Sequence, residues 1–143
     1  CRAAYNLNLG EGKVIWEFDV PLFGKQPKSG HGPEAFGDQV YSATRLENGN
    51  TLIGTGNGHS VLEVTPDKEI IWKLDQHDLP GITLAWVTQV RRLRNGNTLF
   101  VNCHAGPKNP QIIEVTPDKE VVWTYRDFEL FGNALPVAVV ETE

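Results

Sequence analysis

The sequence predicts an all-β fold, a segment of a β-propeller made of repeated four-stranded blades. The first observation is an internal repeat: EVTPDKE at 63–69 recurs unchanged at 114–120, and NGNTL at 48–52 recurs at 95–99. These pairs are 51 and 47 residues apart, so the second copy has four extra residues, at 103–110. Such a period suits either a helical pair or a propeller blade. The second observation, turn chemistry, favours the blade.

Each copy contains two turn signals between short apolar runs. Asn-Gly at 48–49 separates 42–46 from 51–54, and this dipeptide favours a type I′ hairpin turn because both positions tolerate positive φ. Thr-Pro-Asp-Lys at 65–68 then joins 61–64 to 70–74, with Pro presetting φ at a turn corner. No useful window shows helical periodicity. Each unit is therefore predicted to contain four strands, named A to D in chain order.

The repeat leaves incomplete blades at both ends. Residues 4–9 and 14–19 resemble C and D strands, and 135–140 resembles a further A strand. We therefore expect one partial propeller over 1–143, divided as follows: blade remnant 1–20, blade 41–75, blade 88–127 and A strand 135–140. Closed propellers generally have four or more blades. Two explanations stay open: a fragment of a longer protein, or a chain that completes its ring by pairing strand edges with itself or with a missing half.

A tryptophan recurs at one position of the predicted D strands, as Trp16, Trp72 and Trp123. A large ring in the outer strand is able to lock one blade to the next. Because the position recurs in each unit, we expect packing between blades rather than ligand stacking.

Composition excludes several partner classes. Thirteen Lys and Arg against 18 Asp and Glu give a net charge of −5, the wrong sign for binding nucleic acid. No apolar run approaches the roughly 20 residues of a membrane span. The two cysteines and four histidines lack the paired spacing of a zinc site, so no metal is predicted, the cofactor stays unknown, and Cys103 is expected to be a small buried or loop thiol. Common nucleophile, phosphate and dinucleotide motifs are absent, which leaves an enzyme without support.

The histidines indicate a candidate ligand face. In a propeller, the B–C and D–A connections lie on one rim and the hairpins on the other. His31 and His77 fall in D–A connections, and His59 and His104 in B–C loops. Imidazole donates or accepts a hydrogen bond or binds a metal ion, and an adjacent Trp offers a stacking surface. A small polar or sugar-like ligand therefore fits this rim. The alternative is that these loop histidines are solvated or cap backbone groups and bind no ligand. The candidate binding residues on this rim are His31, His59, His77, Trp86, Asn102 and His104.

Two arginines give a second candidate site. Arg45 and Arg92 each stand three residues before an Asn-Gly turn, in the predicted A strands nearest the axis. They are able to form an anion site in the central channel, or to pair with Glu or Asp of a neighbouring blade, because buried Arg is normally paired. Glu63 and Glu114 also repeat, which favours a structural role, since an active site need occur only once.

Taken together, NGNTL, EVTPDKE and the strand Trp resemble secreted bacterial β-propellers with pyrroloquinoline-quinone-like (PQQ-like) and arylsulfotransferase-like repeats. More similar still is a subgroup of propeller-domain proteins whose last blades carry stretches such as 54–59, 79–86 and 102–107. The resemblance covers nearly the whole chain. It implies a secreted or periplasmic parent with about six blades, of which this is the C-terminal half. No histidine here matches a catalytic motif of these families.

Three functions follow as hypotheses. The first is a binding or interaction module whose ligand face is the histidine-bearing rim. The second is a sulfotransferase-like or quinoprotein-like enzyme that uses those histidines, which requires at least two of them to converge with perturbed pKa values. The third is a purely structural propeller that assembles through its strand edges.

Overall fold

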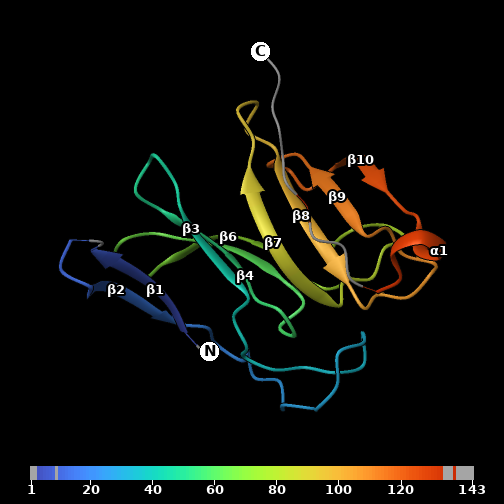
Figure 1. The fold of residues 1–143 in the computed structure, drawn as a ribbon, viewed down its shortest axis with the longest axis horizontal. Coiled ribbons are helices and arrows are strands. Elements are labelled where there is room, and N and C mark those ends of the chain that lie inside the picture. The colour runs from blue at the N-terminus through green and yellow to red at the C-terminus, as the bar shows by residue number, and fades with distance from the viewer. Residues whose placement is uncertain (1–2, 9, 134–136, 138–143) are drawn as a thin grey trace.

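The computed structural model describes residues 3–8, 10–133 and 137, and these form a partial β-propeller (Figure 1). Within them, ten strands make three antiparallel sheets, in the orders β1-β2, β3-β4-β5-β6 and β7-β8-β9-β10. The fold class is confirmed: two four-stranded blades follow one C–D pair. The strands and the single short helix are β1 (Ala3–Asn8), β2 (Lys13–Asp19), β3 (Ser42–Arg45), β4 (Thr51–Gly54), β5 (Val61–Val64), β6 (Ile70–Leu74), β7 (Trp86–Arg92), β8 (Thr98–Cys103), β9 (Ile112–Val115), β10 (Val121–Tyr125) and α1 (Phe128–Phe131).

The Asn-Gly hairpins differ from the type I′ turn that the sequence predicts. The Gly49 amide donates to the Leu46 carbonyl at 3.0 Å, and the Leu46 amide donates to the Asn50 carbonyl at 2.8 Å. Gly49 has a φ of 87°, whereas Asn48 is not among the residues with positive φ. The prediction was wrong because the loop has three residues, and such loops combine a type I turn with one left-handed residue. The turn at Lys68 repeats this pattern, with a φ of 70°.

The C–D pair has the same irregularity in all three sheets. Trp16 pairs with Asn6, Trp72 with Glu63, and Trp123 with Glu114, and in each case the register shifts beside the pair. Trp16 Nε1 donates to the Pro66 carbonyl at 3.0 Å, and Trp72 Nε1 donates to the Pro117 carbonyl at 2.8 Å. The predicted blade-to-blade lock is therefore confirmed for these two.

The apolar core lies between blades. One cluster joins Phe18 of β2 to Ile53 and Leu62 of the first blade. A larger one joins Leu52 of the first blade to Phe100 of the second, and both side chains are fully buried. Each such residue contributes about 2 kcal/mol through burial. Stacking of successive sheets therefore holds the blades together, as a propeller requires.

The region after β10 contains an element that the sequence did not predict. Helix α1 begins after Asp127, whose carboxylate accepts a hydrogen bond from the Leu130 amide at 3.0 Å. Four residues are too few to show helical periodicity. The A strand predicted at 135–140 lies outside the described residues except for Val137, whose amide donates to Gln89 Oε1 at 2.9 Å. In the described part of the chain, α1 is far too short to cross a membrane, and no other helix occurs.

Candidate functional site

Three aromatic side chains from separate segments meet at the rim that carries the B–C loops and D–A connections. The ring centres of His31 and Trp86 are 4.7 Å apart, and those of His31 and His104 are 5.1 Å apart. Trp86 and His104 lie 6.3 Å from each other. His31 is exposed, whereas the other two are half-buried. We call these three residues the His31–Trp86–His104 cluster.

His31 lies at the tip of a closed loop between β2 and β3. Backbone hydrogen bonds join Lys28 and Phe36 in both directions, at 2.8 and 2.9 Å. Two side chains from the first blade then hold the loop by its carbonyls. Gln76 Nε2 donates to the Pro33 carbonyl at 2.7 Å, and His59 Nε2 contacts the Ala35 carbonyl. The loop is therefore closed at its base by Lys28 and Phe36 and anchored by side chains on the C-terminal side of its tip.

Trp86 and His104 come from adjacent strands of the second blade. Trp86 begins β7 and pairs with Cys103, the last residue of β8, which is a free and buried thiol as expected. His104 follows with a φ of 57°, and its amide donates to the Asn133 carbonyl at 3.0 Å. Gly56 permits the close approach of the Gln39 carbonyl, because a Cβ there would lie 2.7 Å from it, while the Trp86 ring would be in ordinary contact at 3.5 Å.

The surroundings of His104 shift its pKa. Burial lowers its pKa from the ordinary value of 6.5, and the charge of His31 lowers that pKa further. The imidazole is therefore mainly neutral near pH 7. Its Nδ1 atom is buried and makes no hydrogen bond within the described residues. Buried polar atoms normally have partners, so the partner of this nitrogen lies outside the described residues.

Two other candidate residues have structural contacts. His59 is fully buried, and its Nδ1 contacts the Ala85 carbonyl while Nε2 contacts that of Ala35. Asn102 is 1% exposed; it accepts from the Ala85 amide at 2.8 Å and donates to the Thr83 carbonyl at 3.1 Å. Both side chains tie loops to the start of β7. A role for either in ligand binding stays a prediction.

His77 is exposed in the turn that follows β6, and in the described part of the chain no ring contact joins it to the cluster. Gln76, its neighbour, was not predicted to matter, yet it anchors the His31 loop. Sequence offers no signal for this role, because Pro33 lies 43 residues away. The cluster thus unites three of the six rim candidates.

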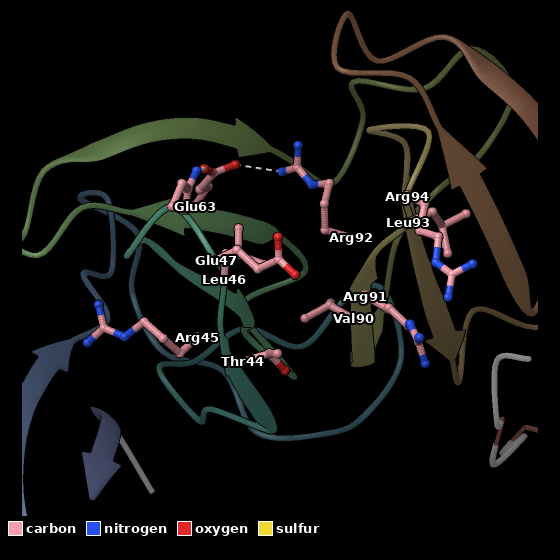
Figure 2. Close-up of a pocket in the computed structure, with 11 residues that line it drawn as sticks. Thr44, Arg45, Leu46, Glu47, Glu63, Val90, Arg91, Arg92, Leu93 and Arg94 are labelled. Carbon is pink, nitrogen blue, oxygen red and sulfur yellow. Dashed lines mark hydrogen bonds and ion pairs between the residues drawn. The ribbon is translucent and has the colours of Figure 1, made fainter. Parts of the chain in front are cut away.

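The arginine candidates lie at a pocket of about 840 Å³ beside the A–B hairpins (Figure 2). Arg92 Nη2 donates to Glu63 Oε2 at 2.6 Å, and its guanidinium lies 5.8 Å from the Trp72 ring centre. Arg45 lies 5.3 Å from the Trp16 ring centre. Ion pairing between blades, the alternative to an anion site, is therefore confirmed for Arg92. An anion-binding role for either arginine stays a prediction.

The repeated glutamates bind their own hairpins. Glu63 Oε1 accepts from Asn50 Nδ2 at 2.8 Å, and Glu114 Oε1 accepts from Asn97 Nδ2 at 2.7 Å. These contacts agree with the structural role expected from repetition. In residues 3–8, 10–133 and 137, no group of three or more His, Cys, Asp or Glu side chains is placed to hold a metal ion.

Comparison with known proteins supports the fold alone. No protein-family model matches the chain, and curated proteins give no match. A solved protein of unknown function from Bacteroides caccae is similar in structure, with a TM-score of 0.63 and 22% identity over 85% of this chain. A streptogramin B lyase structure aligns over 81% of the chain with 19% identity and a TM-score of 0.48. The chain spans 41% and 31% of their respective lengths.

Proposed function

We propose that this chain is a ligand-binding segment of a β-propeller and that the His31–Trp86–His104 cluster binds a small, neutral, polar ligand. The observation that carries this proposal is the buried Nδ1 of His104, which has no hydrogen-bond partner among the described residues, beside the half-buried indole of Trp86. A carbohydrate suits both groups. Its apolar ring face packs on Trp86, and its hydroxyl groups bond to the imidazole nitrogens.

The proposal is tested with methyl β-glucopyranoside and methyl β-galactopyranoside as probes. Imidazole nitrogen resonances are followed during the titration. We expect His31 and His104 to shift and the buried His59 to stay unchanged. His31→Ala is expected to weaken binding at least about tenfold, while His77→Ala, another exposed loop histidine, leaves it unchanged. Equal loss in both variants, or no shift with either sugar, contradicts the proposal.

A second candidate function is acid–base catalysis of the sulfotransferase type. Two histidines converge, and burial lowers the pKa of one of them, His104. A neutral imidazole is able to accept a proton from an attacking hydroxyl, with His31 as the nearby acid. Release of p-nitrophenol from p-nitrophenyl sulfate, with phenol as acceptor, tests this. Activity that survives in His104→Gln as well as in His77→Gln rules out this role.

The resemblance to PQQ-like and arylsulfotransferase-like repeats also supports a proposal about context. We place the chain in a longer secreted or periplasmic propeller. Fractionation of cells that express the parent gene tests the location, with recovery in the cytoplasmic fraction as the contradicting result.

A further inference from the structure

The buried side chain of His59 lies between the two segments that carry His31 and Trp86. Its Nε2 contacts the carbonyl of Ala35, which belongs to the loop that carries His31. Its Nδ1 contacts the carbonyl of Ala85, the residue before Trp86 and the start of β7. One fully buried ring therefore joins the His31 loop to the segment that enters the second blade.

Both contacts of this ring are to hydrogen-bond acceptors. A carbonyl oxygen accepts and never donates, whereas a neutral imidazole has one N–H and one bare nitrogen. In either neutral tautomer, one ring nitrogen would therefore present its lone pair to a carbonyl oxygen. Apart from the imidazole, no donor reaches the carbonyl of Ala35 or Ala85 within the described residues. Only an imidazolium, with a hydrogen on each nitrogen, is able to satisfy both buried carbonyls.

Carbonyl dipoles rather than a carboxylate face the ring nitrogens of His59. In the described part of the chain, no Asp or Glu forms an ion pair with this ring. Its own B–C loop and the segment before β7 that contacts it contain no other titratable side chain. On the remaining side, the Phe36 ring centre lies 6.0 Å from the imidazole, and Lys25 Nζ lies 4.8 Å from the same Phe36 ring.

The loop packed on His59 also carries three exposed titratable side chains and a half-buried one: Lys28, His31, Glu34 and Asp38. None of them is a printed contact of the ring, whose polar contacts are the two carbonyls. A buried charge is costly unless it is hydrogen-bonded. Two charge-assisted hydrogen bonds to carbonyl oxygens supply that compensation for His59.

Gln76 joins the same two segments without a titratable group. Its Nε2 donates to the Pro33 carbonyl at 2.7 Å and to the Leu84 carbonyl at 3.1 Å. Pro33 lies two residues before the loop carbonyl that His59 contacts, and Leu84 lies one residue before the other. Two side chains therefore connect the His31 loop to the start of β7, and only the connection through His59 depends on a proton.

We propose that His59 is an imidazolium in the folded protein and that its second proton couples the His31 loop to the start of β7. As the pH rises and the ring loses one proton, one of the two carbonyl contacts is lost, and Gln76 alone still donates to both segments. The stability from that contact is therefore present at low pH and lost at high pH. Given the proposed ligand site, on which this step rests, the loop is then held less firmly beside Trp86, and ligand binding weakens.

The protons of His59 are measured first and without ligand, so this result does not depend on the proposed function. Two-bond nitrogen–proton correlations show whether each imidazole nitrogen carries a hydrogen. In a titration from about pH 5 to about pH 9, we expect both nitrogens of His59 to carry hydrogen at the acidic end. The amide resonances of Phe36 and Trp86, which follow the two carbonyls, are expected to change as the ring loses one proton. A single neutral tautomer over the whole range overturns the proposal.

His59→Gln separates this titration from those of the two cluster histidines. Glutamine does not titrate, so the amide resonances of Phe36 and Trp86 are expected to lose that pH dependence. His77→Gln, which removes an exposed histidine, is the matched control and retains it. The same pH dependence in His59→Gln overturns the proposal. Near-ultraviolet circular dichroism checks that the variant is folded, and if it is not, the ring nitrogens of the wild-type protein decide alone.

Sugar binding then tests the link to the site. The two methyl glycosides are titrated into the wild-type protein and His59→Gln at both ends of the pH range, and the ratio of the two Kd values cancels the titration of the cluster histidines. We expect His59→Gln to raise Kd at least about threefold at the acidic end and to leave it unchanged at the basic end. A ratio that does not change with pH overturns the coupling. Absence of binding to both proteins contradicts the proposed function alone, because the ring and amide resonances still decide whether His59 couples the loop.

Discussion

The two B–C loops, residues 55–60 and 104–111, use histidine in opposite ways. In the shorter loop, His59 is fully buried and both ring nitrogens contact backbone carbonyls. In the longer loop, His104 is half-buried, and its Nδ1 has no partner in the described part of the chain. Both residues have a left-handed backbone, with φ values of 56° and 57°. Residue type and backbone conformation therefore do not decide which histidine is available to a ligand.

The two histidines hold different positions within their loops. A backbone hydrogen bond closes each loop, from Thr55 to Ser60 at 3.1 Å and from Asn102 to Gln111 at 2.8 Å. His59 comes just before the closing residue, so its side chain enters the contact between blades. His104 directly follows the last residue of β8 and lies next to Trp86. Position along the loop thus goes with the difference between the two histidines.

The largest expected effect on stability comes from removing the buried His59, and removal of the half-buried His104 is the comparison. His59→Ala leaves buried carbonyls without partners and opens a cavity, so we expect a loss of about 2–4 kcal/mol in the free energy of unfolding. His104→Ala is expected to cost less than about 1 kcal/mol, since its Nδ1 makes no hydrogen bond within the described residues. Urea unfolding measures both. Equal losses would contradict the division of roles.

Removal of Gln76 is expected to have an intermediate effect. Its amide donates to the carbonyls of Pro33 and Leu84, at 2.7 and 3.1 Å. Gln76→Ala is expected to cost about 1–2 kcal/mol, because both hydrogen bonds disappear. It also frees the loop that carries His31. Faster amide exchange at Ala35 and Phe36 would show this, and unchanged exchange there would exclude Gln76 as an anchor.

Acid is expected to destabilise the connection between β6 and β7. This connection contacts the His31 loop through Gln76 and the shorter B–C loop through Ala85. Burial raises the pKa of Asp75, but hydrogen bonds from Lys73 and the Gln76 amide bring it below the ordinary 3.8. Burial likewise raises the pKa of Asp78, and its contact with Lys119 lowers it overall. A lowered pKa stabilises the fold fully above the ordinary value, and this contribution disappears as the pH falls through the folded-state value.

Both carboxylates are partly exposed, so we expect each to contribute only a few tenths of a kcal/mol. Urea unfolding of Asp78→Asn between pH 7 and pH 3 measures the effect. The variant is expected to lose less stability on acidification than the wild-type protein. An identical pH dependence would show that the ion pair with Lys119 contributes nothing.

The smallest effect concerns the titration of His104. Burial and the charge of His31 lower its pKa below 6.5. We expect His31→Ala to raise that pKa, because the positive charge is gone, while burial still keeps it below the ordinary value. Proton resonances of the imidazole ring report the midpoint. A decrease in the variant would show that the two rings do not interact through charge.

Much of the fold was predictable because local signals repeat. The segments at 48–52 and 63–69, with their copies, placed two hairpins in each blade, and Trp16 and Trp72 indicated contacts between blades. Asn-Gly alone did not identify the turn type, since this dipeptide also suits a three-residue loop with glycine in the left-handed position. Helix α1 gave no signal because it is a single turn fixed by Asp127.

The sequence by itself determined the strand order, the positions of the turns and the rim on which the four histidines lie. These follow from turn chemistry and from the alternation of chain direction in an antiparallel sheet. Only the tertiary structure decided that His31 joins Trp86 and His104, that His59 is buried, and that Arg92 pairs with Glu63. Each of these contacts joins residues distant in sequence. Their formation depends on loop length and on the stacking of blades, which local pattern does not specify.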